Sequence, residues 1–336
     1  MGKKRLQKEQ EQLMLDLMQL SDKTTTRIHS LLDYSMENIT KEIEDIYYKY
    51  KERYGLSDEE MLKVMSEKLT PYEIKQYADK GIFSMADAMS LQNNITRLTV
   101  LKSYIGSQMQ YVEHLSKSYL EELLITVVDT TRDRNIFNIS KEIGFELEYN
   151  KMPKAKMDKL LHHQWMDSNF YKRIQHNCGA LQDQVEKVLT DGVLRGKPIS
   201  YMAQQIEQTT NYGKVASTRL VRTETAHFHN KVEGEQYEEL GIEKYMIVAT
   251  LDCRTCSKAH GDKKSCGELD GKVFKVSDRK EGVNYPIFHV NCRCTTVVYI
   301  DDETRANLQR RARTKDGKSI VLDKYMSYED WYKKYN

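Results

Sequence analysis

Two long apolar stripes in the first 120 residues constrain the fold more than any other feature of this chain. Their members recur three or four positions apart, which places each stripe on one face of an α-helix. Prolines, which would interrupt such helices, number only four in 336 residues. The sequence therefore predicts two long amphipathic helices that pair as an antiparallel hairpin. The stripes consist of Ile28, Leu32, Met36, Ile39, Ile43, Ile46 and Tyr50, and of Leu91, Ile95, Leu98, Leu101, Ile105, Met109, Val112, Leu115 and Tyr119.

These stripes have two interpretations. They pack against each other within the chain, which is the commoner use of an apolar stripe, or they form a coiled-coil arm that binds a partner. Local signals set the helix ends. Gly55 is expected to close the first helix, and the second long helix is expected to begin at Ser84 with Asp87. Between them, Ser57 with Glu60 and Thr70 with Pro71 and Glu73 predict two short helices.

The rest of the sequence, together with these helices, predicts an α+β protein that is mostly helical. We expect a looser segment from Thr130 to Pro153, and short strands where glycine becomes frequent after Gly241. The predicted helices cover 154–163, 167–191, 199–210 and 216–240, with Gly213 separating the last two, and the predicted strands cover 245–251, 272–276 and 294–300. The predicted organisation is a helical arm or hairpin at 1–150, a helical region at 151–240, a small Cys/His-rich α+β domain at 241–300 and a tail at 301–336.

Charge and hydropathy exclude several functional classes. With 52 basic and 50 acidic residues, the net charge of +2 argues against a dedicated nucleic-acid binder. No run of about 18 apolar residues exists, so no membrane span is predicted. The N-terminus is too charged for a signal peptide. We therefore expect a reducing cytoplasm, where clustered cysteines are metal ligands or free thiols rather than disulfides.

Five of the six cysteines lie between Thr250 and Tyr299. A structural zinc site needs four nitrogen or sulfur ligands, usually supplied as two short-spaced groups. The spacing here is not that of a standard zinc finger, and the candidates outnumber the places. The alternative is that the thiols are small core residues and the histidine only hydrogen-bonds its loop. The zinc-ligand candidates are Cys253, Cys256, Cys266, His289, Cys292 and Cys294.

A second polar cluster, Arg222–His229, lies on the helix before the strands. His227 and His229 are two positions apart and face different sides of a helix, so they are poor co-ligands. We expect Arg222 and Glu224 to make buried polar contacts that fix this helix against the sheet. The basic run at 310–318 is interpreted as a solvated linker, and the aromatic tail as a docking helix or a cap on the domain.

Three stretches resemble the phage head-morphogenesis family, which includes the Mu-type protein F domain and minor capsid proteins of phages of Gram-positive hosts. The resemblance covers about 160–300, with several motifs in the same order. Departures are a long gap between Cys256 and Cys266, and Ile287 and Val290 at positions where proline is usual. Cys253 and Cys294 stand where serine is usual. The matching residues are Trp165, Phe170, Arg173, Ile174, Gly192 and Gly196, then Arg222, Thr223, Glu224, Asp252, Arg254 and Thr255, and finally Cys266, Asp270, Gly271, Asn284, Pro286, His289, Cys292 and Arg293.

The resemblance implies a minor head protein, present in few copies inside the capsid near the portal. Its implied partners are the portal protein, other head or scaffold proteins and, more weakly, phage DNA, with no membrane. The expected location is the virion, and the host cytoplasm during assembly. The implied roles are procapsid assembly and DNA packaging or ejection, with no enzymatic activity. Some relatives carry a C-terminal toxin domain, for which the segment after Ile300 is too short.

Two other functions remain open. His289, Asn291 and the flanking cysteines suggest a metal-dependent nuclease of the H-N-H kind, because metal-activated water cleaves phosphodiesters. Such a site needs an upstream His-His or Asp-His pair, and His260 is the only candidate for it. Non-specific DNA binding inside the head is the third hypothesis, and the near-neutral charge argues against it.

Overall fold

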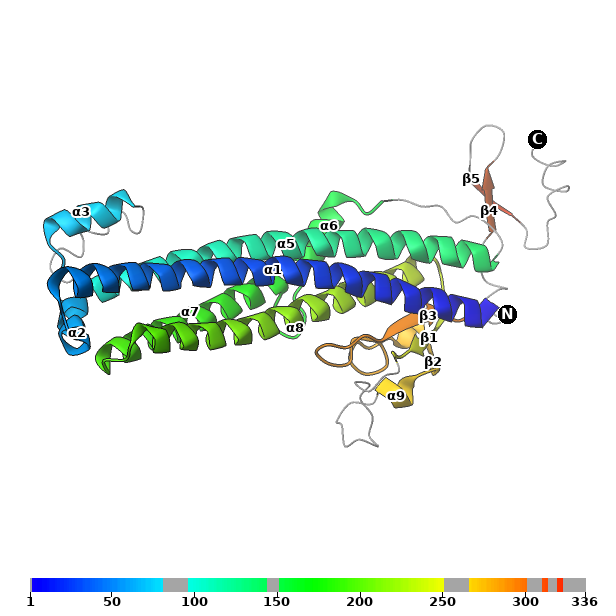
Figure 1. Cartoon of the computed structure of the whole chain (residues 1–336). Helices are drawn as coiled ribbons and strands as arrows, with labels where there is room; N and C mark the ends of the chain where they lie inside the picture. Colours follow the sequence, from blue (N-terminus) through cyan, green and yellow to red (C-terminus); the bar gives the residue numbers. More distant parts are fainter. Residues whose placement is uncertain are drawn as a thin grey trace. The chain divides into compact units, whose positions relative to one another are not determined.

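The computed structural model describes residues 2–80, 96–143, 151–250, 266–300, 310–313 and 319–322. Helices dominate it, and a small antiparallel sheet follows them, which confirms the predicted α+β class (Figure 1). No helix in these ranges is long and apolar enough to cross a membrane. The helices are α1 (Gly2–Tyr54), α2 (Asp58–Ser66), α3 (Pro71–Asp79), α5 (Arg97–Ile143), α6 (Lys154–Leu161), α7 (Phe170–Leu194), α8 (Ile199–Glu239) and α9 (Cys266–Leu269); the strands are β1 (Lys244–Val248), β2 (Val273–Lys275), β3 (Thr295–Val298), β4 (Arg310–Arg313) and β5 (Ser319–Leu322).

The chain forms two compact units, and neither is continuous in sequence. The sheet unit comprises Met1–Asp22, Glu122–His162 and Arg222–Asn336. The helical unit comprises Lys23–Glu121 and His163–Val221. Helices α1, α5 and α8 each contribute one part to each unit, so every long helix has two different environments along its length.

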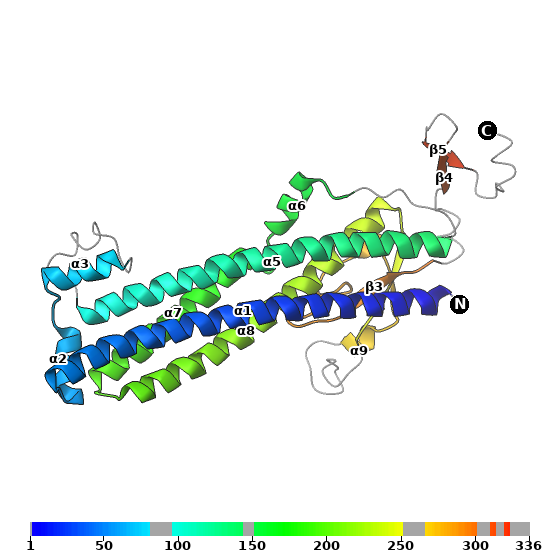
Figure 2. The ribbon, with the colours of Figure 1, turned by 45° about the horizontal axis from the view of Figure 1, so that its top comes forward.

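In the helical unit, most described members of the two predicted stripes are buried; Leu98, Leu115 and Tyr119 are partly exposed, and Leu91 and Ile95 lie outside the described residues. All seven members of the first stripe are buried, as are Leu101, Ile105, Met109 and Val112 of the second. Helices α1 and α5 lie side by side (Figure 2), and the Arg27 guanidinium stacks 3.8 Å from the centre of the Tyr119 ring. Ile28, Val112 and Leu181 line one common apolar cavity, so the stripes share an interior with α7. Packing within the chain therefore accounts for these stripes.

The short helices begin where the sequence predicts, but the second long helix does not. Ser57 with Glu60 and Thr70 with Glu73 each form a complete capping box. Ser84 and Asp87 lie outside the described residues, and α5 begins only at Arg97. Thr96 directly precedes α5; it forms a β-bridge with Lys68, and its Oγ1 accepts the Thr99 amide at 3.2 Å.

The looser segment predicted from Thr130 to Pro153 is wrong over 130–143, because α5 continues to Ile143; residues 144–150 lie outside the described residues. Its polar residues resemble loop formers in the sequence, but Thr131, Arg132 and Asn135 are buried and paired with α8. The Asn135 amide donates to Gln236 Oε1 at 3.1 Å, and Thr131 Oγ1 lies 2.9 Å from His229 Nδ1. These tertiary hydrogen bonds offset the poor helix propensity of asparagine and threonine.

The predicted break at Gly213 is also wrong, because α8 is continuous from Ile199 to Glu239. A Cβ atom at Gly213 would lie 3.1 Å from Leu181 Cδ2. The glycine therefore permits close approach of α7 and α8 rather than ending a helix. The predicted end at Gly241 is correct, since α8 stops at Glu239 and Gly241 adopts a φ of +67°.

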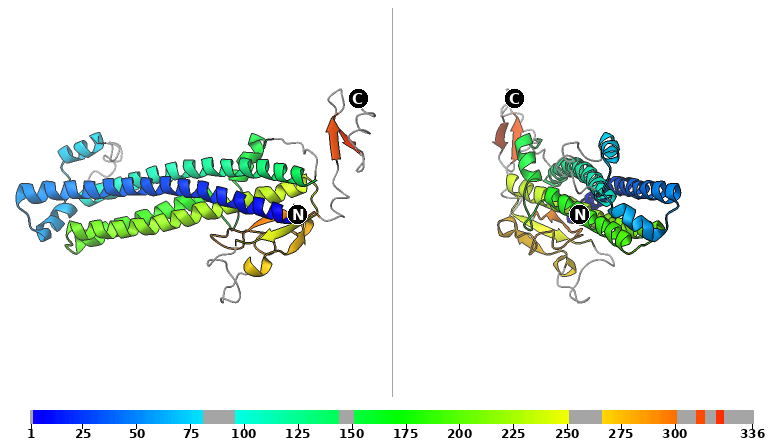
Figure 3. Two further views of the ribbon diagram at one scale, coloured as in Figure 1. Left: turned by 45° about the vertical axis from the view of Figure 1, so that its right-hand side comes forward. Right: turned by 90° about the vertical axis from the view of Figure 1, so that its left-hand side faces the viewer.

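The sheet unit contains the three predicted strands. Their order is β2-β1-β3, with both pairs antiparallel and Tyr245 opposite Phe274 and Val298. The sheet lies beside the C-terminal part of α8 (Figure 3), and Tyr237 of α8 stacks on Tyr245 of β1. The interpretation of 310–318 as a linker is wrong at its start, because Arg310–Arg313 forms β4 and pairs with β5. The aromatic tail after Leu322 lies outside the described residues.

Candidate functional site

The structure brings four of the six predicted zinc-ligand candidates together in the sheet unit. Cys266 begins α9, His289 and Cys292 lie in the turn before β3, and Cys294 immediately precedes β3. The ligand atoms of the first three all lie within 4.8 Å of one another. The Cys294 thiol is in hydrogen-bonding contact with the thiols of Cys266 and Cys292. The remaining candidates, Cys253 and Cys256, lie outside the described residues, as do Asp252, Arg254 and His260.

The His289 ring is oriented by its own backbone. Its Nδ1 lies 2.7 Å from the Val290 carbonyl oxygen, which can only accept, so Nδ1 carries the ring proton. Its Nε2 therefore presents a lone pair, and it lies 3.2 Å from Cys266 Sγ. The ring is partly exposed, whereas all three thiols are buried.

Helix α8 holds the turn that carries these ligands. Asn291 adopts a φ of +60°, a conformation that asparagine tolerates better than most residues, and its amide donates to Thr223 Oγ1 at 3.0 Å. The Asn230 side chain donates to the Cys294 carbonyl at 3.0 Å. Thr250 Oγ1 donates to the Arg293 carbonyl at 2.9 Å. The backbone on both sides of Cys292 is thus fixed from neighbouring elements.

The three thiols differ in acidity because they hydrogen-bond one another. Contacts from Cys266 and Cys294 favour the thiolate of Cys292 and hold the pKa of that thiol well below its usual range. The Cys292 thiolate, together with Cys294 and burial, in turn raises the pKa of Cys266. The cluster therefore favours one thiolate that accepts from its neighbours.

The structure bears out only part of the prediction for the Arg222–Thr223–Glu224 motif. Arg222 is partly exposed and forms an ion pair with Asp22 of α1 at 2.8 Å, so the expected buried contact to the sheet is wrong. Thr223 instead makes a contact to the ligand turn through Asn291. Glu224 is fully buried, as predicted, and His227 is also buried.

Other motif residues shape turns. Asp270 Oδ1 accepts the Ala249 amide at 2.9 Å, and Gly271 follows with a φ of +71°, which favours glycine. Asn284 accepts the Lys280 amide at 2.7 Å and donates to the Asp278 carbonyl at 2.9 Å, which closes its loop. Pro286 is buried in the same loop. These side chains satisfy backbone groups that irregular segments would otherwise leave unpaired.

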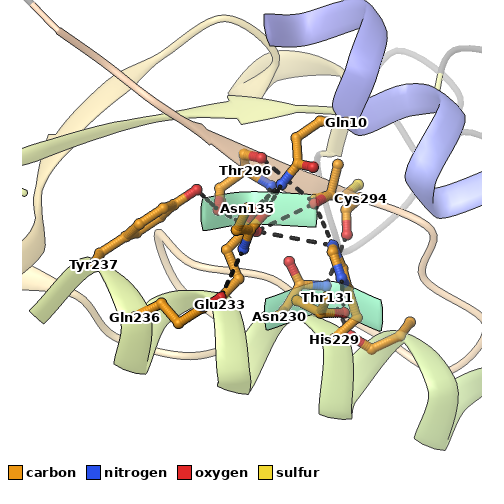
Figure 4. Close-up of polar contacts among 12 residues, drawn as sticks. Gln10, Thr131, Asn135, His229, Asn230, Glu233, Gln236, Tyr237, Cys294 and Thr296 are labelled. Carbon is orange, nitrogen blue, oxygen red and sulfur yellow. Dashed lines mark hydrogen bonds and ion pairs between the residues drawn. The ribbon is translucent and has the colours of Figure 1, made fainter. Parts of the chain in front are cut away.

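Sequence reasoning missed a buried polar network centred on Glu233 (Figure 4). Glu233 is fully buried; it accepts from Thr296 Oγ1 at 2.7 Å and from the Gln10 side chain. His229 joins it, with Nε2 at 2.7 Å from Thr295 Oγ1. The available signal was spacing: Ala226, Asn230, Glu233 and Tyr237 recur every three or four residues, like a core stripe that includes polar members.

Burial shifts the two ionisable groups of this network in opposite directions. Loss of solvation raises the pKa of Glu233 from 4.5 to about 7, although the threonine hydrogen bonds oppose the shift. Loss of solvation also lowers the pKa of His229 from 6.5 to about 3. Both shifts favour neutral forms, as expected for groups without access to water. Because both side chains are fully buried, we interpret the network as structural.

Comparisons with known proteins identify one matching family and two relatives. Residues 183–297 match the family model described as Phage Mu protein F like protein. The chain is 28% identical over 175 residues to an NAD(+)–arginine ADP-ribosyltransferase of Enterococcus faecalis, covering 48% of this chain and 33% of that protein. It is 25% identical over 120 residues to an uncharacterized protein of Haemophilus influenzae, covering 36% of this chain and 25% of that protein. No solved structure matches.

The family match points first to a class, that of phage head- or capsid-related proteins, for which the virion is the implied location. More particularly, the Phage Mu protein F like domain at 183–297 supports assignment to the phage head-morphogenesis family, as the sequence motifs predicted. The matched region includes the C-terminal part of α7, the whole of α8 and α9, and the three-stranded sheet up to Val297 of β3. The chain spans only about a third and a quarter of the two curated relatives.

Proposed function

We propose that this chain is a minor head protein that acts in procapsid assembly near the portal and assists DNA packaging or ejection. The observation that carries this proposal is the Phage Mu F-like domain at 183–297, which contains the Cys/His cluster and Glu233, the centre of the buried network. The sheet unit would be the rigid module of such a protein. The helical unit would contact the portal or other head proteins.

The uses of the motif side chains support a structural role rather than turnover. Asp270 and Asn284 hold turns, and Thr223 fixes the ligand turn. A catalytic group must reach its substrate, whereas these groups are engaged with backbone atoms. We therefore propose no enzymatic activity. ADP-ribosyl transfer is named for a relative of which this chain covers only a third, so we do not extend it to this chain.

Exposed aromatic side chains on the helical unit support a protein-binding role for it. Tyr34 and Tyr48 of α1 are about half exposed, and Tyr72 of α3 is 71% exposed. Tyrosine is enriched at protein–protein interfaces, because it buries a large apolar area and still offers a hydroxyl. The proposed partners of this surface are the portal protein and other head or scaffold proteins.

Quantitative mass spectrometry of purified particles tests the proposal, with the portal protein as internal standard. We expect peptides of this chain at a small fraction of the major capsid protein, and their loss from particles assembled without the portal. A variant with Tyr34, Tyr48 and Tyr72 changed to serine is expected to fold normally and to be depleted from particles. Absence of the wild-type chain from heads and procapsids alike would reject the role.

The nuclease alternative predicts a histidine that is free to activate water at a phosphodiester. His289 instead directs one ring nitrogen to the Val290 carbonyl and the other to Cys266. Plasmid nicking with Mg²⁺ or Mn²⁺ that disappears in His289→Ala would revive this alternative. A gel shift that weakens steeply with salt would do the same for non-specific DNA binding.

A further inference from the structure

We propose that Cys266, His289, Cys292 and Cys294 bind one zinc ion, which ties α9 to the turn before β3. This inference is independent of the proposed role in the phage head. The cluster combines three cysteines and one histidine, which is one of the ligand sets of structural zinc sites. The four residues come from two segments separated by more than twenty positions, so a bound ion would cross-link the sheet unit.

Distances within the cluster fit a shared ion. Zinc lies about 2.3 Å from sulfur and about 2.0 Å from nitrogen, so tetrahedral ligands lie roughly 3.5–3.8 Å apart. Cys266 Sγ and His289 Nε2 are 3.2 Å apart, and no pair among these two atoms and Cys292 Sγ exceeds 4.8 Å. Cys294 completes the set, since its thiol contacts those of Cys266 and Cys292. A separation at the 4.8 Å limit would have to shorten by about 1 Å to reach tetrahedral spacing.

The orientation of the His289 ring is that of a metal ligand rather than of a histidine that only packs in the core. Metal-binding histidines usually donate their second ring N–H to a carbonyl or carboxylate, which fixes the tautomer and ring orientation. His289 does so through Nδ1 to the Val290 carbonyl. The lone pair on Nε2 then points at the thiols, as coordination requires. A histidine that only stabilised its loop would not need to direct the second nitrogen at the Cys266 sulfur, with Cys292 Sγ also within 4.8 Å.

The backbone supports the charge that coordination would create. Three thiolates with one Zn²⁺ carry a net charge of −1, which costs free energy when buried without hydrogen bonds. Backbone groups of Phe288 and Cys294 hydrogen-bond the Cys292 sulfur, and that of Thr250 hydrogen-bonds Cys294. These contacts stabilise thiolates in the positions where a zinc ion would need them. Loading the site leaves all three sulfurs as thiolates, with release of the protons held by Cys266 and Cys294.

Contacts from α8 hold the ligand turn in place, which favours a rigid metal site with a structural role. Thr223 holds the Asn291 amide and Asn230 holds the Cys294 carbonyl, so both ends of the H-x-x-C-x-C turn are positioned before any ion binds. Preorganisation of this kind lowers the cost of ordering the ligands on binding. There are two alternatives to a bound ion. The thiols pack in the core without an ion, or two of them form a disulfide.

Metal analysis of the full-length chain tests the proposal. The protein is expressed with zinc in the medium and purified without chelators, and its zinc content is measured by plasma mass spectrometry. We expect one zinc per chain and none of the other first-row metals in comparable amount. Titration with a mercurial should release zinc together with modification of the thiols. Cobalt added to protein stripped of metal should give the visible bands of tetrahedral thiolate coordination.

Variants identify the ligands. Cys292→Ser and His289→Ala are expected to lose the zinc, and Cys178→Ala, which changes the buried cysteine of α7, is expected to keep it. His289→Cys should restore metal binding, which a residue needed only for packing would not do. A wild-type chain without zinc and without cobalt bands would overturn the proposal. Retention of zinc in Cys294→Ser, with loss in Cys253→Ser or Cys256→Ser, would overturn the assignment of the fourth ligand.

Discussion

The interiors of the two units differ in chemistry although the same three long helices contribute to both. The interior of the helical unit is built mainly from apolar side chains such as Ile39, Met109 and Leu189, although Arg97 is also buried and pairs with Glu73. The interior of the sheet unit includes fully buried polar groups, among them His229, Asn230 and Glu233. Apolar contacts tolerate many neighbours, whereas each buried polar group requires a particular partner.

This difference shows where the specificity of the chain resides. In the helical unit, stability follows from burial and packing, and any well-shaped apolar set would serve. In the sheet unit, Glu233 takes hydrogen bonds from α1 and from β3, and Asn230 bonds to the backbone just before β3. The polar groups therefore specify which strand lies on which helix. Their removal should make the position of the strand on the helix less well defined and should also lower the stability.

The largest effect is expected from truncation in the apolar interior. Leu189→Ala removes a fully buried side chain from α7 and leaves a cavity, so we expect a loss of about 2–5 kcal/mol in unfolding free energy. Leu194→Ala, on the same helix but 68% exposed, is the matched control and should change stability by less than about 0.5 kcal/mol. Urea unfolding, with hydrogen exchange to localise the change, measures both. Equal losses in the two variants would contradict the assigned interior.

Glu233→Gln tests the buried ionisable group through pH. The pKa of Glu233 is raised to about 7 in the folded state, so its favourable contribution is complete below 4.5 and is lost as pH rises through 7. The stability of Glu233→Gln relative to wild type should therefore increase by roughly 3 kcal/mol between pH 4.5 and pH 8, since one pKa unit is about 1.4 kcal/mol. Urea midpoints across this range measure the difference. A constant difference would contradict the shift.

The neighbouring histidine supplies an internal check on that experiment. The pKa of His229 is lowered to about 3, so its favourable contribution is present above 6.5 and is lost as pH falls through 3. In wild type the two slopes oppose each other between pH 4.5 and pH 6.5. In Glu233→Gln only the histidine slope remains, so stability should rise with pH from about 3 to 6.5.

Asn230→Ala probes a single polar contact of the sheet unit. The Cys294 carbonyl would lose its donor in a buried position, and an unsatisfied buried group costs about 1–3 kcal/mol. Asn211→Ala, on the same helix and exposed, should change stability by less than about 0.5 kcal/mol. Hydrogen exchange of the β3 peptides would report the loss. Unchanged exchange in β3 would show that the helix does not hold the strand through this residue.

The sequence predicts the helical unit better than the sheet unit for a physical reason. The stripe from Ile28 to Tyr50 and the capping boxes at Ser57 and Thr70 are local signals, and the structure confirms them. The continuation of α5 through Asn135 depends on Gln236, which lies 101 positions away. Local propensity cannot register such a partner, so the segment resembled a loop in the sequence.

The candidate site shows the same division. The ligand types and the H-x-x-C-x-C spacing could be read directly from the sequence, and they identified Cys266, His289, Cys292 and Cys294 among the candidates. The sequence could not predict that these residues lie together in space, because their positions depend on Thr223 and Asn230 of α8. The ion pair of Arg222 with Asp22 was unpredictable for the same reason, since 200 positions separate the partners.

The smallest predicted effect tests whether glycines of the helical unit serve packing or are merely tolerated. Gly179 of α7 is exposed with nothing within 4 Å of an added Cβ, so Gly179→Ala should stabilise the unit by about 0.5–1 kcal/mol through helix propensity. Gly213→Ala would gain the same propensity but bring a Cβ within 3.1 Å of Leu181 Cδ2, so its net gain should be smaller or reversed. Thermal unfolding of the two variants measures the difference. Equal stabilisation would show that α7 and α8 have room between them at Gly213, and that the glycine is not needed for their close approach.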